Sequence, residues 1–130
     1  GRESSPARVL PLDELKSAVP PGTVDVAVNI HSFSECPPGA IDAWIAFLAR
    51  KRVGHLMVVP NAVTYDGSDG SDGAAGADGV TMRTNEGLDF TRIVHRHGYR
   101  LVASEPKFAD PVVQEYGLSP AAHLLFRLRS

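Results

Sequence analysis

The chain has 130 residues, a formal net charge of −2 at pH 7 and a single cysteine. This length fits one domain with a modest core, and the weak negative charge argues against a nucleic-acid-binding surface or a basic membrane-binding face. One cysteine excludes an internal disulfide, and the sequence shows neither a signal peptide nor an apolar run near the roughly 20 residues of a membrane helix, so we expect a cytoplasmic protein with no nucleic-acid or membrane partner.

The first predicted elements are a strand at residues 24–30 and a helix at residues 40–52. The strand is nearly all apolar and rich in β-branched residues, which is typical of a buried strand. Four apolar residues at helical spacing form the buried face of the helix: Ile41, Trp44, Ile45 and Leu48. This spacing assigns Trp44 to the core rather than to a sugar-stacking surface. Gly54 is placed to end the helix in the left-handed conformation.

A second buried strand is predicted at residues 55–63, followed by a flexible loop at residues 64–79. The loop is rich in glycine and aspartate and has almost nothing to bury. Its aspartates invite a calcium-binding interpretation. The EF-hand frame that begins at Asp69 nevertheless places Ala74 and Val80 where a glycine and a glutamate are required, which disfavours calcium.

The rest of the chain predicts a helix at residues 86–97, a strand at 99–108, a short helix or turn at 110–117 and a final alternating strand at 123–129. Helix-length crossovers between buried strands indicate an α/β fold with a mostly parallel sheet and helices on both faces. The connection before the final strand allows that strand to run antiparallel.

Reactive side chains crowd the carboxyl end of the first strand. Within eight positions the chain places Asn29, His31, Ser32, Ser34, Glu35 and Cys36. Ligands of open α/β sheets bind beyond the carboxyl ends of the strands, so this cluster is the candidate site.

Residues 24–37, VDVAVNIHSFSECP, resemble the fourth strand and following loop of class I S-adenosylmethionine-dependent methyltransferases. The segment NIHSFSE is most similar to the sugar O-methyltransferase group of that family. Residues 55–63 resemble the fifth strand, residues 91–108 the next helix and sixth strand, and residues 121–129 the antiparallel seventh strand. The resemblance implies a Rossmann-like methyltransferase half-sheet and identifies residues 1–130 as the C-terminal part of a methyltransferase domain.

The glycine-rich loop that holds the methyl donor in that family has no counterpart in this sequence. The resemblance therefore implies an incomplete enzyme, in which the strand at residues 24–30 is an unpaired edge because the central strands of the family would lie beside it. The expected partner is the missing N-terminal half of the domain or a second chain that pairs with this edge. A homo-oligomer is a further option.

The activity implied by the resemblance is methyl transfer from S-adenosylmethionine to a sugar or glycoside hydroxyl. His31 is the predicted general base because imidazole titrates near neutral pH. Glu35 is predicted to orient His31, to take the proton itself or to bind Mg²⁺. Asn29 and Ser32 are predicted to contact the methyl donor, as is Asp13, which matches an acidic position near the adenine in the family.

Asn61 and Tyr65 are predicted to contact the acceptor, since Asn61 follows the second strand at the same edge and Tyr65 borders the loop. Structural roles remain open for three of the site residues. His31 can serve a purely structural role, Glu35 can interact with the dipole of the following helix, and Asn61 can form a turn.

Two other classes of function remain as alternatives. A non-catalytic α/β scaffold or dimerisation module derived from a methyltransferase agrees with the missing glycine-rich loop. A hydrolase of unspecified type would require a nucleophile elbow, and the sequence contains no G-x-S-x-G.

Overall fold

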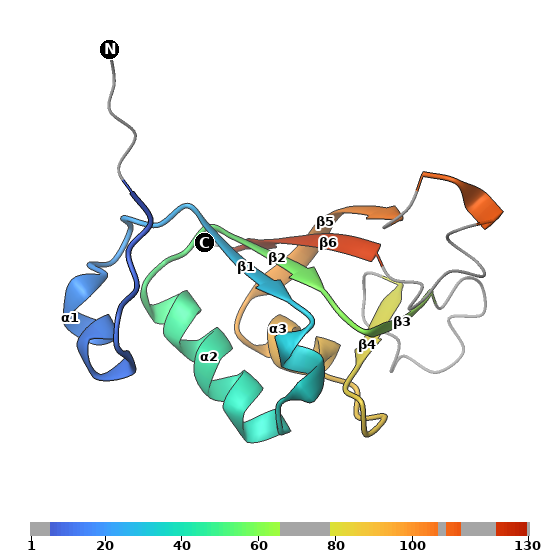
Figure 1. Ribbon diagram of the computed structural model, residues 1–130, viewed down its shortest axis with the longest axis horizontal. Coiled ribbons are helices and arrows are strands. Elements are labelled where there is room, and N and C mark those ends of the chain that lie inside the picture. Colours follow the sequence, from blue (N-terminus) through green and yellow to red (C-terminus); the bar gives the residue numbers. More distant parts are fainter. Residues whose placement is uncertain (1–5, 66–78, 107–108, 113–121, 130) are drawn as a thin grey trace, which may run out of the picture.

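The computed structural model describes residues 6–65, 79–106, 109–112 and 122–129. A four-stranded sheet has the order β1-β2-β6-β5, and β3 and β4 form a separate two-stranded sheet (Figure 1). The strands are β1 (Val26–Ile30), β2 (His55–Val59), β3 (Ala62–Tyr65), β4 (Val80–Arg83), β5 (Tyr99–Pro106) and β6 (Ala122–Leu128).

Strand directions in the larger sheet agree with the sequence prediction. β1 and β2 pair in parallel, whereas β6 is antiparallel to both of its neighbours, β2 and β5. β1, β2 and β5 therefore run the same way, and the C-terminal strand is the one that runs against them. A mixed α/β fold with an antiparallel final strand is confirmed.

The prediction of helices on both faces is wrong for the described residues. The longer helices, α2 (Pro38–Arg50) and α3 (Thr91–Arg96), contact each other and lie on the same face of the sheet (Figure 1). α2 connects β1 to β2, and α3 lies on the longer path from β2 through β3 and β4 to β5. Both paths advance in the same direction across the larger sheet, and successive right-handed crossovers of that kind place their helices on one face. The other helical segments whose bounds lie within the described residues are short: η1 (Leu12–Glu14), α1 (Leu15–Ala18) and η2 (Ser32–Glu35).

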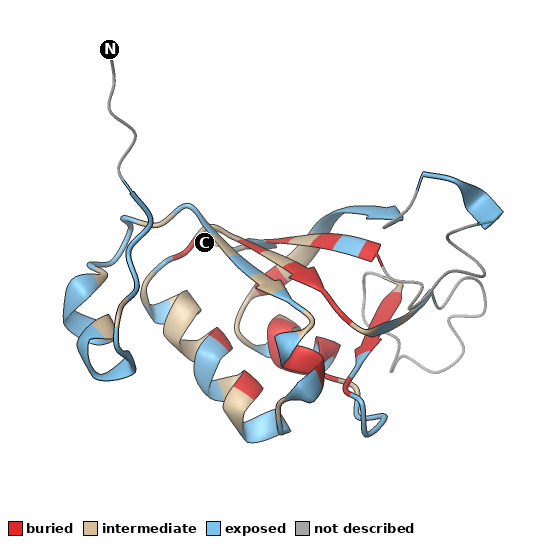
Figure 2. Ribbon diagram, viewed as in Figure 1, coloured by how far each residue is buried: buried red, intermediate tan, exposed pale blue. Residues whose placement is uncertain are grey.

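The core lies between the helices and the sheet (Figure 2). Ile41 and Ile45 of α2 are fully buried, as predicted. The assignment of Trp44 to the core is wrong, because 37% of its surface is exposed. Trp44 lies toward the β1 edge of the sheet. No described strand continues the sheet beyond β1, so Trp44 stays partly uncovered. No described helix has the length and apolar character needed to cross a membrane.

Arg52, not Gly54, takes the left-handed position that ends α2. Its φ is 56°, whereas Gly54 has no positive φ. The Val53 N–H donates to the Leu48 carbonyl and the Arg52 N–H donates to the Ala49 carbonyl, both at 3.0 Å. These two bonds form a Schellman motif in which a glycine is usual at the position of Arg52.

The second helix begins at Thr91, five residues later than the predicted start at Glu86. A turn occupies the intervening segment, in which the Gly87 N–H donates to the Thr84 carbonyl at 2.9 Å and Gly87 has a φ of 87°. The Asp89 carboxylate then accepts the Thr91 N–H at 2.9 Å, which favours a helix start at that point.

The predicted flexible loop at residues 64–79 is partly wrong. Thr64 and Tyr65 belong to β3, which pairs with β4; residues 66–78 lie outside the described residues. Of the predicted short helix or turn at residues 110–117, the described part begins with the Val112 N–H donating to the Asp110 carboxylate at 2.8 Å.

Two polar contacts connect the elements of the core. The Tyr99 hydroxyl donates to the Val53 carbonyl at 2.7 Å, and burial raises the pKa of Tyr99 to about 12. Asp42 of α2 lies 2.8 Å from Nε2 of His97, directly after α3. This hydrogen bond, aided by the charge of Arg96, lowers the pKa of the Asp42 carboxyl against a smaller opposing effect of burial.

Candidate functional site

His31 follows β1 directly and has an unusual backbone conformation, with φ 65° and ψ −30°. Such a conformation costs a non-glycine residue about 1–3 kcal/mol, and residues held in it are enriched at functional sites. It is held because the His31 N–H still donates to the Val59 carbonyl of β2 at 2.8 Å, while η2 begins at the next residue.

The imidazole of His31 contacts Asn61. Its Nδ1 lies 2.6 Å from Oδ1 of Asn61, which follows β2. An amide oxygen can only accept, so Nδ1 carries the proton and Nε2 is left as the basic nitrogen. The orienting partner of His31 is thus Asn61 rather than Glu35, and two residues predicted for separate roles meet in one pair.

Asn61 is itself held by two further residues. Its backbone N–H donates to the Ser34 hydroxyl at 2.8 Å, and its side-chain Nδ2 donates to Oδ1 of Asn85 at 3.0 Å. The Asn85 N–H donates to the Ser34 carbonyl at 2.7 Å. We call His31, Asn61, Asn85 and Ser34 the histidine relay. Asn85 was not predicted as a site residue, because it directly precedes the helix predicted at residues 86–97, although Thr84–Gly87, TNEG, is a typical turn sequence.

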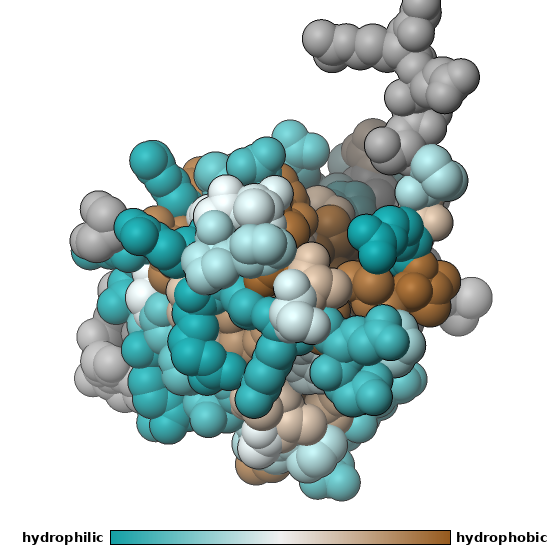
Figure 3. Space-filling model, turned by 90° about the vertical axis from the view of Figure 1, so that its left-hand side faces the viewer, coloured by the Kyte–Doolittle hydropathy of each residue, from teal (hydrophilic) through white to brown (hydrophobic). Residues whose placement is uncertain are grey.

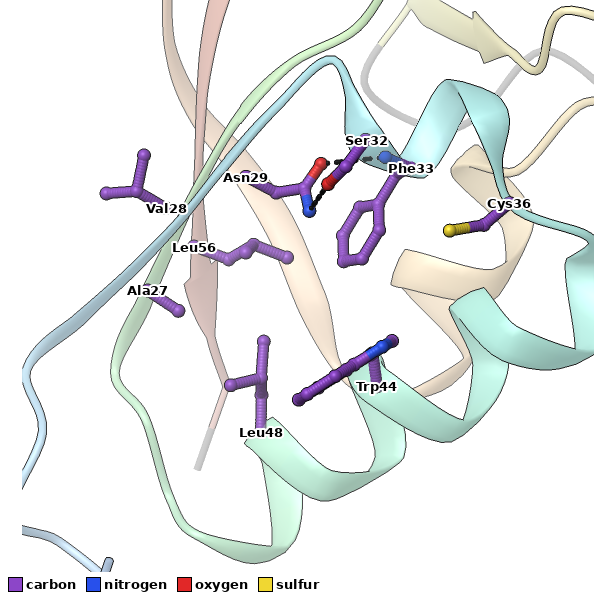
Figure 4. Close-up of a pocket in the computed structure, with 9 residues that line it drawn as sticks. All are labelled: Ala27, Val28, Asn29, Ser32, Phe33, Cys36, Trp44, Leu48 and Leu56. Carbon is purple, nitrogen blue, oxygen red and sulfur yellow. Dashed lines mark hydrogen bonds between the residues drawn. The ribbon is translucent and has the colours of Figure 1, made fainter. Parts of the chain in front are cut away.

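An apolar pocket of about 350 Å³ lies between β1 and α2 (Figure 4). Its lining residues are Ala27, Val28, Asn29, Ser32, Phe33, Cys36, Trp44, Leu48 and Leu56. Asn29 and Ser32, the predicted donor contacts, provide most of its polar groups. The Asn29 amide donates to the Ser32 hydroxyl at 2.6 Å and accepts the Phe33 N–H at 3.0 Å.

A polar pocket of about 300 Å³ lies on the other side of η2, against the turn before α3. Its lining residues are Ser34, Glu35, Cys36, Pro37, Pro38, Thr84, Asn85, Glu86 and Leu88. Glu35 is exposed here and shares the pocket with Glu86. Two members of the histidine relay, Ser34 and Asn85, line this pocket. His31 itself lines neither pocket.

Two predicted site residues are not brought into this arrangement. Asp13 lies exposed in η1 and lines neither pocket. Tyr65 is 54% exposed at the end of β3 and also lines neither pocket. Within the described ranges, no group of three or more His, Cys, Asp or Glu side chains could hold a metal ion.

Among the described residues, β1 is an edge strand of the larger sheet, and one side of its backbone has no partner strand. Asp25 and His31 flank β1 and both bond to β2, at 2.9 Å and 2.8 Å, so the odd-numbered residues of this parallel ladder face β2. Val26, Val28 and Ile30 therefore direct their N–H and C=O groups away from the sheet. Their side chains are 49%, 56% and 56% exposed. The face of the molecule on the side of α1 shows apolar surface among polar groups (Figure 3).

No protein-family model and no curated protein matches the sequence. Among solved structures, the chain is similar to the crystal structure of the cyclase SpnF, with a TM-score of 0.45 and 16% identity over 84% of this chain and 52% of that chain. The chain thus spans about half the length of that structure. A likeness at this level carries no argument about the activity of this chain.

Proposed function

We propose that the chain is part of an S-adenosylmethionine-dependent O-methyltransferase that acts on a sugar or glycoside hydroxyl, with His31 as the general base. The observation that carries this proposal is the bond between His31 Nδ1 and Asn61 Oδ1, which leaves Nε2 free to take a proton. The resemblance of NIHSFSE to sugar O-methyltransferases supports the choice of acceptor.

The step that this chain supplies is removal of the acceptor proton. The hydroxyl O–H bond breaks, the proton moves to Nε2 of His31, and the oxygen keeps the electron pair, which makes it the nucleophile. The resulting imidazolium keeps its Nδ1–H bond to Asn61. The polar pocket suits the body of the acceptor, because its hydroxyl, amide and carboxylate groups are those that bind sugar hydroxyls and its volume is at the lower end for ligand pockets. His31 does not line this pocket, so the proposal requires the reacting hydroxyl to extend beyond it, past Asn85, to reach Nε2.

The described residues do not fit S-adenosylmethionine on their own. The apolar pocket can accept an aromatic ring beside Phe33 and Trp44. Its lining includes no carboxylate for the ribose hydroxyls and no charged group for the amino-acid end of the donor. We therefore propose that a further polypeptide segment completes the donor site, and that it adds a strand to the edge of β1, where Val26, Val28 and Ile30 present unpaired backbone groups.

Mg²⁺ remains a proposal for the acceptor side. Glu35 and Glu86 both line the polar pocket, and a cation between the acceptor oxygens and such carboxylates would stabilise the developing alkoxide.

The test is methyl transfer from labelled S-adenosylmethionine to a panel of glycosides, with the chain assayed together with the polypeptide encoded upstream of it. We expect transfer to a hydroxyl, and a loss of about 10²–10⁴-fold in kcat for His31→Gln. His123→Gln, on the exposed side of β6, is the matched control and should keep full activity. Equal transfer by the His31 variant and the control would refute the role of His31.

A second candidate is a non-catalytic scaffold or dimerisation module, which is favoured by the uncharged edge of β1. Natural edge strands are usually protected by charges, prolines or bulges, and β1 contains none of these. Sedimentation of the chain alone tests this candidate. A dimer that Val28→Lys disrupts, and that Val102→Lys on the far edge strand β5 leaves intact, would support it.

A further inference from the structure

We propose that Asn85 is a positioning residue, which acts through Asn61 to keep the proton of His31 on Nδ1 and the lone pair on Nε2. This inference deepens the proposed function and rests on it for its catalytic meaning. The hydrogen-bond geometry that carries it lies entirely within the histidine relay.

Asn61 alone does not determine the tautomer of His31. Its amide has an oxygen on one side and an NH₂ group on the other, and a half-turn about the last side-chain bond exchanges them. With the oxygen toward His31, Nδ1 must carry the proton. With the NH₂ group toward His31, Nδ1 must accept, so the proton moves to Nε2 and the base loses its free nitrogen.

Asn85 resolves this ambiguity. The Asn85 Oδ1 atom is an acceptor 3.0 Å from Nδ2 of Asn61, so it binds the NH₂ side of the Asn61 amide. The Asn61 oxygen is then turned toward His31, where it lies 2.6 Å from Nδ1. In the reversed orientation of Asn61 two oxygens would face each other at this distance, unless the exposed Asn85 amide also made a half-turn. An aspartate at position 85 presents an oxygen in either orientation, so Asn85→Asp fixes the orientation that the asparagine favours.

Both ends of this arrangement are fixed by backbone hydrogen bonds to one buried residue. Ser34 accepts the Asn61 N–H at its hydroxyl and the Asn85 N–H at its carbonyl, at 2.8 Å and 2.7 Å. The turn that carries Asn85 is closed by the Thr84 N–H donating to the Leu88 carbonyl at 2.8 Å. Asn85, which follows β4, thereby orients Asn61 and through it the imidazole of His31, which follows β1.

The experiment is ¹⁵N NMR of the chain with labelled histidine, at about pH 9.5, well above the ordinary imidazole pKa of ~6.5. We expect His31 of the wild type to show a protonated Nδ1 and an unprotonated Nε2. Asn85→Ala should shift the ratio of the two tautomers by about fivefold toward the Nε2–H form, the size expected for the loss of one hydrogen bond. The exposed His123 serves as an internal control.

Two further variants separate positioning from general disruption. Asn85→Asp keeps an acceptor oxygen at this position and should retain the wild-type tautomer. Adding Asn61→Asp to Asn85→Ala places an oxygen on both sides of residue 61, so the Nδ1–H tautomer should return. A backbone amide spectrum of each variant confirms that it is folded.

An unchanged tautomer in a folded Asn85→Ala variant would overturn the inference. So would an Nε2–H wild type, or a double variant that fails to restore the Nδ1–H form. The measurement needs neither donor nor acceptor, so it is independent of the proposed function. Absence of methyl transfer with the expected tautomers would refute the activity and leave the relay intact.

Discussion

Replacing His31 by glycine and by alanine separates the cost of its backbone conformation from the contribution of its imidazole. Both variants lose the hydrogen bond to Asn61, so the difference between them reports on the backbone alone. At φ 65° and ψ −30° a β-carbon is strained, whereas glycine adopts this region freely. We therefore expect the glycine variant to be the more stable of the two.

The expected difference follows from two opposing effects. A β-carbon in a left-handed conformation costs about 1–2 kcal/mol. The additional freedom of glycine in the unfolded chain offsets about 0.4–1 kcal/mol of this. His31→Gly should thus exceed His31→Ala by about 1 kcal/mol in the free energy of unfolding, or about 3–4 °C in Tm for a chain of this length.

Urea unfolding followed by circular dichroism measures this difference for the two variants. The control compares the wild type with Ala46→Gly, a change in the middle of α2. There glycine should lower the free energy of unfolding by about 1 kcal/mol. If His31→Gly were less stable than His31→Ala by a similar amount, the backbone of His31 would carry no strain, and the argument from strain to function would fail.

Three further changes test the packing that supports the site. Arg52→Gly should stabilise the chain by about 0.5–1 kcal/mol, because glycine suits the left-handed end of α2. Ala46→Gly inside the helix should instead destabilise it, and urea unfolding measures both changes. Tyr99→Phe should cost about 1–2 kcal/mol, because the buried Val53 carbonyl loses its donor, and the same change at exposed Tyr65 should cost less than about 0.5 kcal/mol; a smaller loss at Tyr99 than at Tyr65 in thermal unfolding would contradict this. The lowered pKa of Asp42 means that its contact with His97 stabilises the fold above the ordinary carboxyl pKa and is lost as pH falls through the lowered value. Asp42→Asn should therefore lose less stability than the wild type in acid titrations, and parallel curves would refute the assignment.

The sequence predicted those parts of the fold that depend on local periodicity. Ile41 and Ile45 lie on the buried face of α2 as their spacing requires, and the alternation of Leu124 and Phe126 gives the buried face of β6. The antiparallel direction of β6 was implied by the family resemblance, because the length of the connection alone permits more than one topology.

The predictions that were wrong concern features that depend on contacts between elements: the burial of Trp44, the end of α2 and the face of the sheet on which the helices lie. Trp44 has the spacing of a core residue, but its burial depends on whether a strand covers the β1 edge. Arg52 takes the position that local preference gives to glycine, because two backbone hydrogen bonds close the end of α2 there. The helix faces were wrong because their side depends on strand order, which spacing does not reveal.

For the site, the sequence located His31 and Asn61 but not their contact. Their side chains are 30 positions apart and meet only because β1 and β2 are parallel neighbours. Asn85 was missed for the same reason, since its role depends on the turn after β4 lying against η2. Asp13 was predicted as a donor contact from its position in the family, and Tyr65 as an acceptor contact because it borders the predicted loop. In the structure neither residue lines either pocket.

Calorimetric titration with S-adenosylhomocysteine tests the proposed activity most directly. The chain alone offers an apolar pocket without charged groups, so weak or undetectable binding is expected. Addition of the polypeptide encoded upstream should produce one-to-one binding, and Val28→Lys on the β1 edge should abolish it. Absence of binding in both preparations would contradict the assignment to S-adenosylmethionine-dependent methyl transfer.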